Sequence, residues 1–175
     1  TNMLNTTIST EHLQLSLATS EDLMVLKKIY AEATLCYSFD SGYEITSPEV
    51  ILRKGALPSN HIANSSYIYC IYLKGHMIGY IEVYLGFPTS DNIYIPFFYI
   101  TDTYKNKAYG EDVLAYLIEA FGKQNYKTVS VYTALKTWKD LAFWQSCGFD
   151  TILSVEIDSI TTEHNYGHVE LQYII

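Results

Sequence analysis

The chain has 175 residues and a formal net charge of −8, and hydrophobic residues make up 49% of it against 17% charged. This length suits one domain with one sizeable core, and the composition excludes an intrinsically disordered chain. Nucleic-acid binders carry clustered basic faces, which 11 Lys and Arg among 19 Asp and Glu do not supply. No apolar run approaches the ~20 residues that span a bilayer, and no basic, apolar leader opens the sequence. We predict a cytoplasmic protein that binds neither nucleic acid nor membrane, whose acidic surface suits a cationic amine or is an ordinary solvated surface.

The three cysteines are Cys36, Cys70 and Cys147, and none belongs to a CxxC pair. Buried free thiols in a reducing compartment are the expected state. No His, Cys or Asp cluster has metal-ligand spacing, so we expect no metal.

Residues 1–11 are polar, and we expect a flexible N-terminal segment there and a single domain over residues 12–175. The alternation of "LQLSLAT", residues 13–19, predicts a strand. A helix follows, for which Thr19 and Asp22 have capping-box spacing. A shorter helix is predicted over residues 47–54.

The second part of the chain begins with two strand-like runs on either side of Lys74-Gly75-His76, which predict a hairpin. Residues 92–104 predict a central strand, with a bulge or break at Pro96 because proline donates no hydrogen bond. Helical spacing follows in "YGEDVLAYLIEAFG", then a strand in "KTVSVYTAL", a helix in "WKDLAFWQSC", and the closing strands "TILSVEID" and "HVELQYII".

The strand–helix–strand unit from Ile93 to Ala134 predicts a parallel pair. The fold class is therefore α/β, with a mixed, mostly antiparallel sheet of six to seven strands, a central parallel pair and flanking helices.

The stretch "YKNKAYG", residues 104–110, joins the central strand to the long helix. A helix N-terminus presents free N–H groups and partial positive charge, which suits a phosphate. Two lysines and small residues suit a diphosphate site, but this stretch alone is more typical of a solvated loop at a helix start.

The order of these elements resembles a GNAT-type N-acetyltransferase over nearly the whole chain. "LSLATSEDL" has the shape of the family's opening "R-x-A-T-x-x-D", and "KGHMIGYIEV" that of its hairpin. The acetyl-CoA signature [RQ]-x-x-G-x-[GA] corresponds to residues 105–110, and "LAFWQSCGF" to the closing helix.

The resemblance implies an acyl-CoA N-acyltransferase fold and direct attack of a primary amine of a small molecule, an N-terminus or a lysine on acetyl-CoA. The strand before the signature would pair with the pantetheine arm, the loop N–H groups would hold the diphosphate, and two strands would splay around the thioester. The implied cosubstrate-binding residues are Phe98, Tyr99, Ile100, Thr101, Lys105, Asn106, Lys107, Ala108, Tyr109, Gly110, Thr137 and Trp144.

Four positions depart from the family's pattern. Lys105 replaces Arg or Gln and lacks the planar fork, and Ala108 replaces a glycine that positive φ would favour. Trp144 replaces the frequent tyrosine acid, and Thr137 a frequent asparagine. These departures leave open an alternative, a catalytically impaired acyl-CoA-binding sensor or an interaction module.

Three side chains are candidates for proton transfer. Glu82 would serve as the base if burial raised its pKa, but an exposed strand face is the expected place for it. Tyr99 or Tyr132 could give a phenol proton to the leaving thiolate. The resemblance places the acceptor near residues 30–57 and 160–168, and it leaves a homodimer open.

Overall fold

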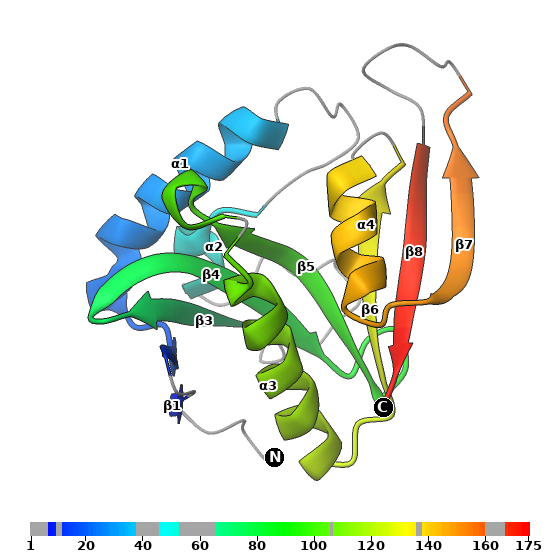
Figure 1. Ribbon diagram of the computed structural model, residues 1–175, viewed down its shortest axis with the longest axis horizontal. Helices are drawn as coiled ribbons and strands as arrows, with labels where there is room; N and C mark the ends of the chain where they lie inside the picture. Colours follow the sequence, from blue (N-terminus) through cyan, green and yellow to red (C-terminus); the bar gives the residue numbers. More distant parts are fainter. Residues whose placement is uncertain are drawn as a thin grey trace.

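The computed structural model describes residues 7–9, 12–37, 46–52, 66–105, 107–135, 138–159 and 167–175. One sheet of eight strands runs through it in the order β1-β2-β3-β4-β5-β6-β8-β7 (Figure 1). The strands are β1 (Thr7–Ser9), β2 (Leu13–Leu17), β3 (Ser66–Leu73), β4 (His76–Leu85), β5 (Asn92–Ile100), β6 (Thr128–Ala134), β7 (Thr151–Ile157) and β8 (Gly167–Ile174). The helices are α1 (Leu23–Tyr37), α2 (Pro48–Leu52), α3 (Tyr109–Lys123) and α4 (Trp138–Ser146), with the 3₁₀ turns η1 (Ser20–Asp22) and η2 (Asp102–Tyr104).

The predicted fold class is confirmed. β5 and β6 form a parallel pair, with α3 as the crossover, and the other pairings are antiparallel. The sheet has one strand more than the six to seven predicted. This strand is β1, three residues long, which pairs with β2 from within the segment that we expected to be flexible. The boundary at residue 12 stays a prediction.

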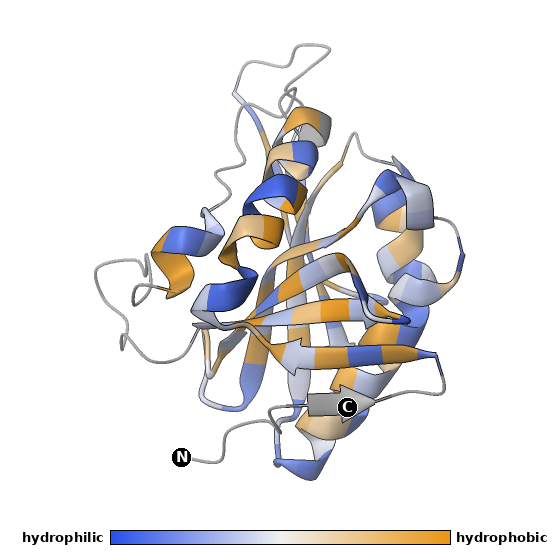
Figure 2. Ribbon diagram, turned by 90° about the vertical axis from the view of Figure 1, so that its left-hand side faces the viewer, coloured by the Kyte–Doolittle hydropathy of each residue, from blue (hydrophilic) through white to orange (hydrophobic). Residues whose placement is uncertain are grey.

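Helices lie on both sides of the sheet and bury two separate clusters (Figure 2). Alternate strand side chains point to opposite faces, so β3, β4 and β5 contribute to both clusters. The cluster under α3 and α4 includes Ile95, Phe121 and Val131, whereas that under α1 and α2 includes Leu26 and Phe97.

Local signals in the sequence place the first helix and the hairpin as predicted. The Asp22 carboxylate accepts the Thr19 amide at 2.8 Å and completes the capping box. Lys74 and Gly75 both have positive φ, 49° and 83°, as the two central residues of a type I′ hairpin turn require.

Pro96 is where β5 loses its pairing with β6. The register against β4 changes from Tyr84↔Tyr94 to Glu82↔Phe97, so β5 holds one extra residue there, and the predicted bulge is confirmed. The parallel ladder to β6 ends at Ile95, although β6 continues beside β8 to Ala134. The two parallel strands therefore diverge beyond Pro96.

The longest described helices, α1 and α3, have 15 residues each. None of the helices in the described part of the chain is long and apolar enough to span a membrane.

Candidate active site

The divergence of β5 from β6 leaves backbone hydrogen-bonding groups directed into an opening. The Thr101 amide donates to the Ile78 carbonyl of β4 at 2.8 Å. Polar backbone groups alternate between the two edges of a strand. Those of Phe98 and Ile100 therefore point away from β4, toward the side that β6 has left, as the pairing with a pantetheine arm would require.

The loop after β5 leads into α3 through a left-handed residue. Ala108, the residue before α3, has φ 60° and ψ 6°, and its methyl group offers no hydrogen-bonding cap. The N–H groups of the first turn of α3 are therefore left to an external acceptor. Glu111 and Asp112 are exposed, so they do not fill this position. Asn106 lies outside the described residues.

At Gly110 there is little room for a side chain, which the sequence alone did not reveal. A Cβ atom added there would lie 3.0 Å from the Cε2 and Cζ atoms of the Phe143 ring and 3.6 Å from Cε1 of Phe98. The second glycine of the signature thus allows α3 to pack closely against α4 and β5.

Lys105 and Tyr99 belong to a polar network at the end of β5. The Lys105 Nζ lies 2.8 Å from Asp102 Oδ1 and 4.3 Å from the centroid of the Tyr99 ring. The Tyr99 hydroxyl donates to Glu32 Oε1 at 3.1 Å, and this oxygen also accepts the Asp102 amide at 2.8 Å. Since Tyr99 packs in the cluster under α1, its phenol faces away from Phe98 and Ile100.

Trp144 is buried in the α4 face of the core. Its ring centroid lies 6.0 Å from that of Phe98 and 5.0 Å from that of Phe149. It therefore lines the region beside the Phe98 backbone through an apolar ring. Thr137 lies outside the described residues.

Glu82 is only 7% exposed, so the expectation of a solvent-facing carboxyl is wrong. It lies on β4 opposite Phe97, and α1 and α2 cover this part of the sheet. Burial raises the pKa of its carboxyl from 4.5 to about 7, against the opposing effect of a 2.9 Å hydrogen bond from Ser66. Such a carboxyl can accept a proton near neutral pH.

Acidic and aromatic side chains share the same sheet face on β4, β5, β6, β8 and β7. Tyr132 stands opposite Glu170 in the register, and its hydroxyl donates to Glu156 Oε2 at 2.7 Å. Burial raises the pKa of Tyr94 to about 12, and the charges of Glu82 and Glu170 add to the effect. These residues, which we call the acidic face, are Glu82, Tyr94, Tyr132, Glu156 and Glu170.

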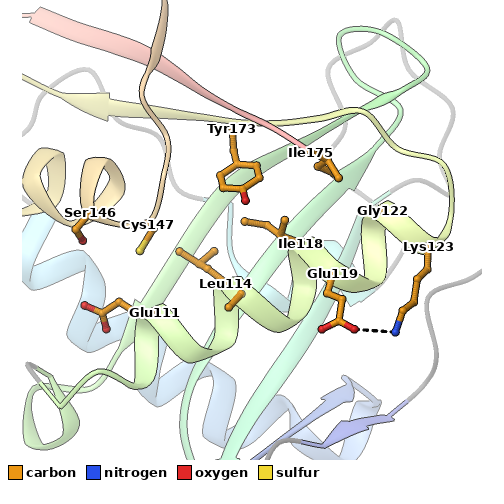
Figure 3. A pocket seen from close by; sticks show the side chains of 11 residues that line it. Glu111, Leu114, Ile118, Glu119, Gly122, Lys123, Ser146, Cys147, Tyr173 and Ile175 are labelled. Carbon is orange, nitrogen blue, oxygen red and sulfur yellow. Dashed lines mark hydrogen bonds and ion pairs between the residues drawn. The ribbon is translucent and has the colours of Figure 1, made fainter.

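The two described cysteine side chains are poor nucleophiles. Burial raises the pKa of Cys70 to about 12 and that of Cys147 to about 11, so neither forms a thiolate readily. Cys147 borders a surface groove of about 680 Å³ beside α3, whose other walls include Leu114, Ile118 and Tyr173 (Figure 3). No described residue of β5 or of the loop before α3 lines this groove.

Sequence reasoning missed Asp140, on the first turn of α4. It is partly buried, and burial raises the pKa of its carboxyl although the positive charge of Lys105 opposes the shift. The available signal was its spacing of four residues from Trp144, which places both side chains on one helix face. Within the described ranges, no group of three or more His, Cys, Asp or Glu side chains could hold a metal ion.

The acceptor region suggested by the sequence is described in part. Residues 30–37, 46–52 and 167–168 are described, whereas residues 38–45, 53–57 and 160–166 lie outside the described residues.

Solved structures of N-acetyltransferases share this fold at low sequence identity. The acetyltransferase from Salmonella typhimurium that modifies the N-terminal serine of ribosomal protein L7/L12 has a TM-score of 0.72 and 14% identity, covering 95% of this chain and 96% of its own. The ribosomal-protein-S18-alanine N-acetyltransferase from Escherichia coli has a TM-score of 0.69 and 13% identity, with coverages of 93% and 94%. The spermidine N-acetyltransferase from Vibrio cholerae, in complex with CoA and spermine, has a TM-score of 0.71 and 14% identity, with coverages of 94% and 96%.

Sequence comparison gives a family but no curated relative. No curated protein matches the chain significantly. Residues 15–164, most of the 175, match the acetyltransferase (GNAT) domain family. The chain therefore belongs to the GNAT acetyltransferases, the acetyl-CoA-dependent N-acetyltransferases that its motifs resemble.

Proposed function

We propose that acetyl-CoA lies in the opening between β5 and β6 and that its acetyl group passes directly to a cationic primary amine bound over the acidic face. The observation that carries this proposal is the end of the β5–β6 ladder at Ile95, directly before the family's cosubstrate segment. The Phe98 and Ile100 backbone would pair with the pantetheine arm. The N–H groups from Lys107 to Gly110 would hold the diphosphate, because that of Lys105 already donates to the Thr101 carbonyl. Lys105 and Lys107 would supply positive charge.

The acidic face supports the choice of a cationic acceptor. No Lys or Arg lies within ion-pair distance of Glu82, Glu156 or Glu170 among the described residues, although the protein has a net charge of −8. Carboxylates beside aromatic rings suit an ammonium group by charge and by cation–π attraction. The spermidine N-acetyltransferase of similar fold, whose structure contains spermine, makes a polyamine a suitable first probe.

Glu82 is the base in this proposal. An ammonium group must lose a proton before its nitrogen can attack the acetyl carbon, and a carboxyl with a pKa of about 7 accepts it at physiological pH. We expect Glu82→Gln to lower kcat by roughly 10²- to 10⁴-fold and to remove the rise of kcat/KM through about pH 7. Ser66→Ala should move that rise to higher pH, because the Ser66 hydrogen bond stabilises the carboxylate.

The experiment combines calorimetric titration with acetyl-CoA and a thiol-release assay on amines of increasing charge. We expect saturable binding, and turnover that is fastest for spermidine, weaker for a monoamine and reduced by salt. Glu170→Gln should weaken the preference for spermidine more than it lowers turnover of the monoamine. Binding without turnover of any amine would favour the acyl-CoA-binding alternative, and no binding at millimolar acetyl-CoA would contradict the proposal.

Three further features remain proposals: a homodimer, a cytoplasmic location, and a function without nucleic-acid or membrane partners. The scarcity of basic residues supports the absence of nucleic acid. Light scattering at micromolar concentration tests the dimer.

A further inference from the structure

The reaction needs a proton for the departing sulfur, and the tyrosines predicted to supply it are engaged elsewhere. The Tyr99 phenol donates to Glu32 on the α1 side of the sheet. The Tyr132 phenol donates to Glu156 at 2.7 Å, and burial together with this hydrogen bond raises its pKa, so it holds its proton tightly. Trp144 has no proton to give at neutral pH.

The geometry of α4 places Asp140 beside the opening. Figure 1 shows α4 lying along β6, and α4 runs back from the end at which β6 terminates, whereas β5 diverges toward α1. Trp144 contacts Phe98 at a ring-centroid distance of 6.0 Å. Asp140 lies one helical turn from Trp144 toward the N-terminus of α4, on the same helix face, and therefore on the β6 side of the opening.

Two further observations agree with this position. The charge of Lys105, in the loop that follows Ile100, acts on Asp140. The inward face of α4 is partly or fully buried at Asp140, Leu141 and Trp144, whereas Lys139 and Ala142 are exposed. No hydrogen bond to the Asp140 carboxyl is formed among the described residues.

We propose that Asp140 is the general acid of the transfer, in place of the tyrosine that Trp144 replaces; this inference rests on the proposed function. The amine nitrogen bonds to the acetyl carbonyl carbon, and the C–S bond breaks with its electron pair on sulfur. The Asp140 carboxyl proton passes to sulfur and gives free CoA. The ammonium nitrogen gives up two protons, one to Glu82 before the attack and one to solvent as the amide forms. Glu82 passes its proton to solvent and the Asp140 carboxylate takes one back, so the transfer releases one proton and the charge balances.

Cosubstrate binding strengthens this role. In the free protein, burial raises the pKa of the Asp140 carboxyl, whereas the positive charge of Lys105 lowers it. A diphosphate held by the loop would bring negative charge beside Lys105 and weaken this lowering of the pKa. Lys105 is the charged group that acts on Asp140 among the described residues, so its neutralisation favours the protonated acid in the ternary complex.

Asp140→Asn tests the assignment, with the exposed Asp150→Asn as a matched control and Tyr132→Phe as the rival acid. Single-turnover rates with acetyl-CoA should fall by roughly 10²- to 10⁴-fold in Asp140→Asn. The decline of rate at high pH that reports the acid should disappear in this variant, while its calorimetric affinity for acetyl-CoA should stay within about 3-fold. The control should match the wild type in every measurement.

An acetyl thioester with an acidic aryl thiol, S-(4-nitrophenyl) thioacetate, separates proton donation from a structural role. Its leaving group needs no acid, so the deficit of Asp140→Asn should shrink to less than about 3-fold. An equal deficit with both donors, or a retained high-pH decline that Tyr132→Phe removes, would overturn the assignment. Failure of the wild type to turn over any amine would instead count against the proposed function.

Discussion

Replacing Ala108 by glycine should stabilise the protein, which is unusual for a substitution at a helix start. Ala108 has φ 60° and ψ 6°, a left-handed conformation that costs an L-residue about 1–2 kcal/mol. Glycine adopts it without that cost but loses more entropy on folding, by about 0.5–1 kcal/mol. The net gain is about 0.5–1 kcal/mol, or a rise in melting temperature of about 2 °C for a chain of this length.

A matched control lies on the same helix. Ala115 is exposed in the interior of α3, where glycine costs about 1 kcal/mol. The two substitutions are chemically identical and should shift stability in opposite directions in urea and thermal unfolding. If Ala108→Gly destabilises the protein as much as Ala115→Gly does, the left-handed turn before α3 is wrong.

Three other substitutions test separate parts of the structure. The pKa of Glu82 is about 7 in the folded protein against 4.5 for an unperturbed carboxyl. The neutral carboxyl therefore contributes its full stability to the fold below pH 4.5. Up to about 3 kcal/mol of this stability is lost as the pH rises through 7. Glu82→Gln should thus gain stability over the wild type between pH 5 and pH 8 in urea unfolding, and an unchanged difference would argue against burial of the carboxyl. Asn92→Ala removes a buried amide that donates to the Phe87 carbonyl at 2.6 Å and to Ser130 Oγ at 2.9 Å, and it should cost about 2–4 kcal/mol, whereas a loss below 0.5 kcal/mol would contradict this network. Lys105→Ala should weaken acetyl-CoA binding about 10-fold in calorimetry, as expected for one charge-assisted hydrogen bond, and unchanged affinity would exclude contact with the diphosphate.

The sequence was most informative where a local rule decides the structure. Capping at Thr19, the turn at Lys74 and Gly75, and the bulge at Pro96 each depend on the conformational limits of a few residues. Pro96, which donates no hydrogen bond, predicted only a bulge or break, whereas the opening between the strands was expected from the family resemblance.

The site was less predictable, because the sheet face on which a side chain lies and its burial depend on elements far away in the sequence. Glu82 lies between Ile81 and Val83 with Tyr80 and Tyr84 beyond them, and the prediction of an exposed strand face gave this apolar run too little weight. Only the placement of α1 shows that the Tyr99 phenol meets Glu32, 67 residues away in the chain. The role of Asp140 likewise requires α4 to lie beside β5.

Amide hydrogen exchange at Phe98, Tyr99 and Ile100 tests the proposed cosubstrate site most directly. Acetyl-CoA at 100 times its dissociation constant should slow exchange at Phe98 and Ile100 by up to about 100-fold, because their N–H groups would pair with the pantetheine arm. Tyr99, whose backbone already faces β4, should be protected before ligand is added and should change little. Saturating acetyl-CoA that leaves the Phe98 and Ile100 amides exchanging at their free rates would contradict the binding mode proposed for β5.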